Sequence, residues 1–151
     1  MTQQIENIKN VRKYLLNLIA DLSVEQLNKI PDGFSNNIIW NLAHLTATQQ
    51  RICYVRSGLQ PVMQDQYITP FIPGTKPEGS IDAAEIETLK SLLISTVEEL
   101  ETDYKKNFFT DYEEITVRYG ITLTNVDDAI NFLLYHEGYH TGVIVELTKF
   151  V

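Results

Sequence analysis

Cysteine is almost absent from this sequence, since Cys53 is the only one in 151 residues. An intrachain disulfide is therefore excluded, and a reducing compartment fits the chain best. The amino-terminal residues lack the order of a signal peptide, because acidic and polar residues precede a helical pattern. We therefore expect a cytoplasmic protein in which Cys53 is a small apolar core residue and not a reactive thiol.

Long apolar runs and clustered positive charge are also missing. No apolar run approaches the ~20 residues that a membrane-spanning helix needs. The formal net charge is −8, and the 12 basic residues are scattered along the chain. Because affinity for nucleic acid depends largely on clustered Lys and Arg, we expect neither nucleic acid nor a membrane as a partner.

The composition that remains is that of a globular protein. Hydrophobic residues make up 44% of the chain and charged residues 21%, which are ordinary values for a folded soluble protein. A chain of this length can bury one sizeable core. We therefore predict a single domain over residues 1–151.

Four long stretches with helical periodicity cover most of the chain, and we predict helices over residues 2–21, 36–57, 82–105 and 125–150. The first carries an apolar stripe at helical spacing, formed by Ile5, Ile8, Val11, Leu15, Leu18 and Ile19. Ser23 and Gln26 have the spacing of a capping box and predict a short extra helical turn. Thr124 with Asp127 is the expected cap of the last helix.

The connections between these helices predict the topology. The first link is short, which favours antiparallel neighbours, whereas residues 58–79 hold four prolines and three glycines and read as a long irregular connection. Such a connection can cross the bundle, so that the second and third long helices run parallel. We predict an all-α, four-helix bundle in up-down-down-up order. Alternation around Gly120 predicts a short extended or hairpin segment before the last helix.

The chain has only three histidines, and two of them, His136 and His140, are four residues apart on the last predicted helix. This spacing places both imidazoles on one face, in a sector that is otherwise largely apolar. A buried polar ring without a partner costs roughly 1–3 kcal/mol, and a metal ion would satisfy both rings at once. The alternative is a pair of histidines hydrogen-bonded to the backbone or to tyrosine hydroxyls.

A site of two histidines is incomplete, and His44 is the only histidine left. It lies on a second amphipathic helix whose face is more polar than a plain core stripe. Since bundle proteins build metal sites between facing helices, we predict that His44, His136 and His140 bind one divalent transition metal. Three imidazoles suit zinc, nickel, copper and iron alike.

The segment HEGYH also matches the HExxH pattern of zinc proteases, with Glu137 in the place of the base. Those enzymes need a further His or Glu ligand downstream, but only eleven residues follow His140, none of them is a histidine, and Glu146 is the sole acid among them. Glu137 also projects about 100° away from His136 on a helix. We therefore favour a different kind of metal centre.

Around these histidines the sequence resembles the DinB-like (YfiT-like) superfamily. The matching stretches are SNNIIWNLAHLTATQQRICYVRSGL and TNVDDAINFLLYHEGYHTGVIVEL. Trp40 and His44 match the first family motif, and His136, His140 and Gly142 match the second. The helix lengths and the long connection agree as well, so the resemblance covers essentially the whole chain.

The resemblance implies an up-down-down-up bundle, often a homodimer, with a three-histidine site for zinc, nickel or a related ion. Relatives include transferases and isomerases that use low-molecular-weight thiols such as bacillithiol or mycothiol. We therefore predict a metal-dependent transferase or hydrolase of small molecules, with a thiol cosubstrate favoured.

Arg51 and Tyr139 are the candidate substrate-binding residues. Arg51 lies two turns after His44 on the same face and can bind a carboxylate, although a salt bridge is the alternative role. Tyr139 flanks the ligands and can donate a hydrogen bond, although packing in the core with a satisfied hydroxyl is the alternative. No general base is recognisable, so the catalytic residues stay unassigned.

Two other classes of protein remain open at this point. A non-catalytic metal-binding or sensory protein would close the site with a fourth protein ligand, whereas an enzyme would leave a coordination position for water or substrate. The second of these classes is a metal-free bundle with three core histidines.

Overall fold

The chain is all-α, as predicted, apart from one small hairpin. The computed structural model describes residues 1–151, and five α-helices cover most of them: α1 (Thr2–Leu18), α2 (Val24–Asn28), α3 (Ile38–Gln49), α4 (Ala83–Lys105) and α5 (Val126–Leu147). The two strands are β1 (Ile115–Thr116) and β2 (Thr122–Leu123), which pair antiparallel with Ile115 opposite Leu123. No helix is long and apolar enough to cross a membrane.

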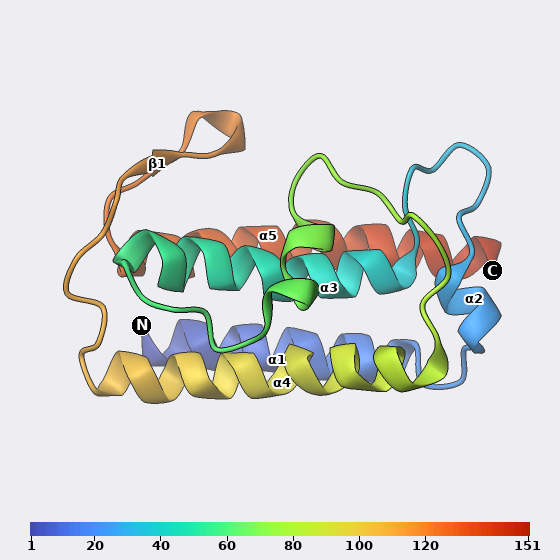
Figure 1. Cartoon of the computed structure of the whole chain (residues 1–151), viewed down its shortest axis with the longest axis horizontal. Coiled ribbons are helices and arrows are strands. Elements are labelled where there is room, and N and C mark those ends of the chain that lie inside the picture. Colours follow the sequence, from blue (N-terminus) through green and yellow to red (C-terminus); the bar gives the residue numbers. More distant parts are fainter.

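The four long helices lie side by side (Figure 1). Helices α1 and α5 run in one direction, and α3 and α4 run in the other. Helix α1 contacts α4 and α5, and α3 contacts the same two helices from the opposite side. The long connection after α3 returns along the helices to the start of α4 (Figure 1), which lets these two helices run parallel.

Side-chain caps define where most helices begin. Ser23 and Gln26 form the predicted capping box of α2, and the Asp82 carboxylate accepts from the backbone N–H of Glu85 at 2.9 Å to start α4. The predicted cap of the last helix is wrong by one residue. The Asn125 side chain is the cap of α5 and accepts from the backbone N–H of Asp128 at 2.9 Å.

Helix α3 does not end as a regular α-helix. It continues as a π-helical turn, η1 (Gln50–Tyr54), and a 3₁₀ turn, η2 (Val55–Ser57), and stops at Gly58, whose φ of 70° is left-handed. The stop at Gly58 was expected from the sequence, but the π turn was not. Within this turn the Gln50 side chain accepts from the backbone N–H of Val62 at 2.8 Å, which ties the long connection to the helix.

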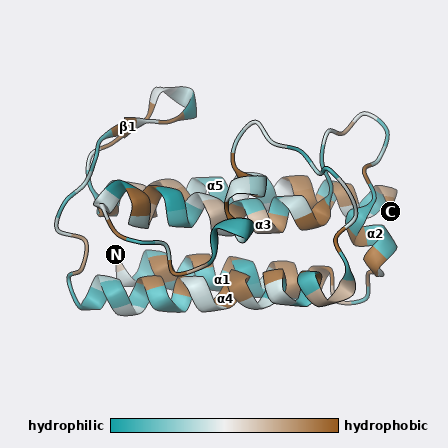
Figure 2. Cartoon of the chain, in the orientation of Figure 1, coloured by the Kyte–Doolittle hydropathy of each residue, from teal (hydrophilic) through white to brown (hydrophobic).

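The core consists of two apolar clusters, and hydrophobic and hydrophilic segments alternate along the long helices, as expected when only one side of each is buried (Figure 2). One cluster includes Leu15, Leu42 and Leu93, and the other includes Ile5 and Ile130. Cys53 is fully buried in the second cluster, as predicted.

The buried face of α1 differs from the predicted stripe. Arg12 is completely buried on this face, whereas Val11 and Leu18 are only half-buried. The buried positions follow the spacing of Ile5, Ile8, Arg12, Leu15 and Ile19. A charged residue therefore occupies a place where the periodicity alone predicts an apolar one.

Candidate metal centre

The three histidines meet between α3 and α5, as the sequence predicted. Their candidate ligand nitrogens all lie within 4.8 Å of one another. His44 and His140 are buried, at 5% and 8% exposure, and His136 is half-buried. No fourth histidine, cysteine or carboxylate belongs to the group. The arrangement offers three nitrogen donors to one ion.

The orientation of His44 is determined by the long connection. Its Nδ1 lies 2.6 Å from the backbone carbonyl oxygen of Phe71, in the 3₁₀ turn η4 (Thr69–Phe71). A carbonyl can only accept, so Nδ1 carries the proton and Nε2 keeps its lone pair. Trp40, one helical turn earlier, stacks on the ring with centroids 4.8 Å apart and an interplanar angle of 10°.

The orientation of His140 is determined by Asn41. The His140 Nδ1 lies 2.9 Å from the Asn41 side-chain oxygen. The Asn41 nitrogen donates to the side-chain oxygen of Asn36 at 2.9 Å and to the backbone oxygen of Asn37 at 2.7 Å. These two bonds identify which end of the amide is oxygen. His140 therefore donates from Nδ1, and its Nε2 is the atom available to an ion.

His136 is the ring whose hydrogen bonding is incomplete. Its Nε2 lies 3.2 Å from the Nε2 of His44, and its Nδ1 is buried without a hydrogen-bond partner. Since His44 keeps a lone pair on Nε2, this contact holds only while His136 carries a proton on Nε2. An ion bound to both Nε2 atoms would replace that contact. The close approach of the two Nε2 atoms and the set of three imidazole donors thus fit a divalent ion that accepts imidazole ligands.

The environment keeps all three rings neutral. Burial, together with the neighbouring His140, His44 and Arg12, lowers the pKa of His136 to about 2. Burial and His44 lower the pKa of His140 to about 3. Burial is the main cause that lowers the pKa of His44, against the hydrogen bond to Phe71. Neutral imidazole is the form that coordinates a metal.

The two candidate substrate-binding residues lie close to the histidines. Arg51, in the π turn, is half-buried, and no salt bridge engages it. Its positive charge contributes to the lowered pKa of His44, after burial. Tyr139 is 50% exposed and packs edge-on against His140, with ring centroids 5.1 Å apart. The alternative of a core tyrosine is therefore wrong, while substrate binding by either residue stays a prediction.

Glu137 lies outside the histidine cluster, as its projection predicted, but it is not at the surface. It is fully buried, and one carboxylate oxygen accepts from Nε and Nη2 of Arg12 at 2.9 and 2.7 Å. Glu137 is thus engaged by Arg12 and is not placed as a base beside the histidines. The sequence analysis did not predict the pairing of Glu137 with Arg12 or the role of Asn41. The signal for the first was a charged residue, Arg12, among the apolar positions of α1, and the signal for the second was the polar face of α3.

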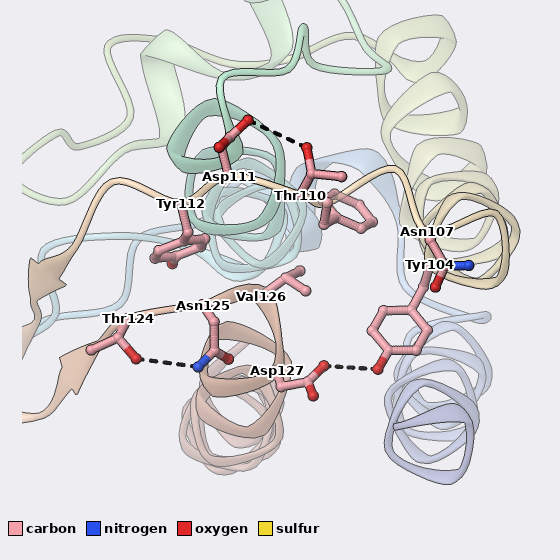
Figure 3. Close-up of a pocket in the computed structure, with 10 residues that line it drawn as sticks. Tyr104, Asn107, Thr110, Asp111, Tyr112, Thr124, Asn125, Val126 and Asp127 are labelled. Atoms are coloured by element: carbon pink, nitrogen blue, oxygen red, sulfur yellow. Dashed lines mark hydrogen bonds between the residues drawn. The ribbon is translucent and has the colours of Figure 1, made fainter.

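Two cavities lie outside the histidine cluster. One, of about 380 Å³, lies at the start of α5 and is lined by polar groups such as Asp111, Asn125 and Asp127 (Figure 3). Within it, the Tyr104 hydroxyl donates to Asp127 at 2.8 Å. The other, of about 410 Å³, lies beside η4 and includes Trp40 and Phe71. Both of these residues also contact His44.

The lowered histidine pKa values predict how the stability of the metal-free protein depends on pH. The histidines of the unfolded chain become protonated near pH 6.5. In the folded protein His140 stays neutral down to about pH 3 and His136 down to about pH 2. The free energy of unfolding should therefore fall as the pH drops below 6.5, by at most ~1.4 kcal/mol per pH unit for each histidine. Urea unfolding between pH 7.5 and 4.5 after treatment with a chelator measures this slope.

The control for this prediction is His136→Gln, which removes one of the proton-binding rings. Its slope of unfolding free energy against pH should be smaller than that of the wild type. A wild-type stability that is flat between pH 6.5 and 4.5, or a slope that the substitution leaves unchanged, would contradict buried neutral histidines.

Comparison with known proteins agrees with this geometry. No curated protein matches the chain. The family model of the DinB superfamily matches residues 7–144, a range that includes all three histidines and all four long helices except the ends of α1 and α5. The chain therefore belongs to the DinB superfamily.

Proposed function

We propose that the chain binds one divalent transition metal, zinc or nickel, through the Nε2 atoms of His44, His136 and His140. The observation that carries this proposal is the pair of Nδ1–H bonds to Phe71 and Asn41, because they leave the Nε2 atoms of His44 and His140 unprotonated within a cluster of three histidines. The scaffold we propose is a single-domain, up-down-down-up four-helix bundle, which the directions of the long helices support (Figure 1).

The reaction class we propose is metal-dependent transfer or hydrolysis on a small molecule, with a low-molecular-weight thiol as the favoured cosubstrate. A metal ion held by three neutral imidazoles lowers the pKa of a bound water or thiol and leaves a coordination position for it. Arg51 is available to bind a carboxylate of the substrate, since no salt bridge engages it. The exposed hydroxyl of Tyr139 can donate a hydrogen bond beside His140.

A non-catalytic metal-binding or sensory protein is the second candidate. The observation in its favour is the engagement of Glu137 by Arg12, which leaves no carboxylate beside the histidines as a general base. The absence of a fourth protein ligand in the cluster favours the enzyme. The homodimer and the cytoplasmic location inferred from the sequence stay predictions.

Metal binding is tested with protein purified without an affinity tag. The wild type should bind one zinc or nickel ion per chain in calorimetric titration, and His44→Ala, His136→Ala and His140→Ala should each lose most of this affinity. Asn41→Ala should weaken binding by roughly 10- to 100-fold, because it removes the acceptor that orients His140.

Asn28→Ala is the matched control for Asn41. Asn28 also donates from its side chain to backbone oxygens, of Val24 and Ile81 at 2.9 Å, but it contacts no histidine. Its metal affinity should equal that of the wild type. Equal metal content in the wild type and in all three histidine variants would show that the histidines are not the ligands.

Activity is tested by a thiol-transfer screen with electrophilic cosubstrates, with and without the bound metal. Turnover should require the metal, and Arg51→Met should raise the KM for a carboxylate-bearing substrate by about 10-fold, the value expected for one charge-assisted hydrogen bond. The kcat should change little, because Arg51 is assigned to binding alone. Metal binding without metal-dependent turnover across thiol and hydrolytic substrates would favour the non-catalytic candidate.

A further inference from the structure

A buried polar layer crosses the middle of the bundle between the two apolar clusters. At its centre is the Arg12 guanidinium of α1, which donates to a residue on each of the other three long helices. Its bonds reach Glu137 on α5 at 2.7 and 2.9 Å, Gln49 on α3 at 2.7 Å, and Thr96 and the Leu93 backbone oxygen on α4 at 3.3 and 3.0 Å.

Stability alone does not explain this layer. Arg12 and Glu137 are both at 0% exposure, so both charges are withdrawn from water. Only one oxygen of the Glu137 carboxylate accepts from Arg12, and the other, Oε2, is buried without any partner. Buried ion pairs with incomplete hydrogen bonding are often no more stabilising than apolar side chains of similar volume. The layer therefore points to a role in orienting the helices.

The contacts of Arg12 lie next to the proposed metal ligands on both helices. Glu137 directly follows His136 and lies three residues before His140. On α3, the Nη2 of Arg12 lies 3.5 Å from the backbone oxygen of Leu45, the residue after His44. Gln49 is held in turn, because its side-chain nitrogen donates to the backbone oxygen of Thr96 at 2.8 Å.

We propose that Arg12 and Glu137 are positioning residues that set the rotation of α3 and α5, so that the three imidazole nitrogens converge. This inference rests on the proposed metal centre. Side-chain atoms lie about 5–6 Å from a helix axis, so a rotation of about 10° moves an imidazole nitrogen by about 1 Å. A metal site tolerates errors of only about 0.5 Å. The ion pair thus acts on the histidines through the two helices and touches neither metal nor substrate.

The test replaces the ion pair by apolar side chains in Arg12→Met/Glu137→Met. This double variant should remain helical and should melt at or above the wild-type temperature. Its zinc affinity should nevertheless fall by at least about 10-fold, in the range found for residues that orient metal ligands. The visible spectrum of the cobalt-loaded protein should change as well, because it reports the coordination geometry.

The matched control is Lys9→Met/Glu101→Met. Lys9 is also on α1, one turn before Arg12, and bonds Glu101 on α4 at 3.3 Å, but no hydrogen bond or salt bridge of this pair reaches α3 or α5. The control should keep the zinc affinity and the cobalt spectrum of the wild type. If the double variant does not fold, Arg12→Lys is measured instead. Lysine keeps the positive charge but lacks the planar guanidinium that bonds Glu137 and Gln49 at the same time. The zinc affinity of this variant should therefore also fall.

A readout without metal separates this inference from the proposed function. In metal-free wild-type protein, ¹H–¹⁵N NMR of the imidazoles should show protons on Nδ1 of His44 and His140, and in the double variant these tautomers should be mixed. A wild type that binds no metal would refute the metal centre, while the NMR comparison would still decide the positioning role. A folded variant with wild-type zinc affinity and wild-type tautomers would overturn that role.

Discussion

The rest of the structure depends on three neutral imidazole rings that lie between α3 and α5. Each buried ring has one N–H that needs an acceptor and one lone pair that needs a donor or a metal. Two acceptors, the Phe71 carbonyl and the Asn41 side chain, take the protons of His44 and His140. The Nε2 lone pairs of His44 and His140 are thereby left free for a bound cation. At His44, the His136 Nε2 lies 3.2 Å and the Thr48 hydroxyl 3.4 Å from this lone pair.

Several irregular features of the fold serve this arrangement. The long connection is held to α3 by Gln50 and supplies the Phe71 carbonyl to His44. Asn37 caps α3 and, through its backbone oxygen, also orients the amide of Asn41. An uninterrupted four-helix hairpin arrangement with short loops would lack the carbonyl acceptor. The second connection therefore has two roles: it lets α3 and α4 run parallel (Figure 1), and it supplies a hydrogen-bond acceptor to the site.

The sequence was sufficient for the features that depend on periodicity and spacing. Four amphipathic stretches predict four long helices, and two histidines four residues apart can only share a face. The partners of buried polar groups were not predictable in this way, because Arg12 and Glu137 are 125 residues apart and meet only once the helices pack. The bond from His44 to the Phe71 carbonyl could not be predicted from the sequence either, since every residue has the same backbone oxygen.

The coordination of the ion is measured most directly by X-ray absorption spectroscopy of the zinc-loaded protein. Three neutral imidazoles with an open position predict three nitrogen ligands at about 2.0–2.1 Å and one exchangeable oxygen ligand. The multiple-scattering pattern of imidazole should fit three rings and should drop to two in His140→Ala. A spectrum with sulfur ligands, or with an all-oxygen shell that none of the histidine substitutions changes, would contradict a three-histidine centre.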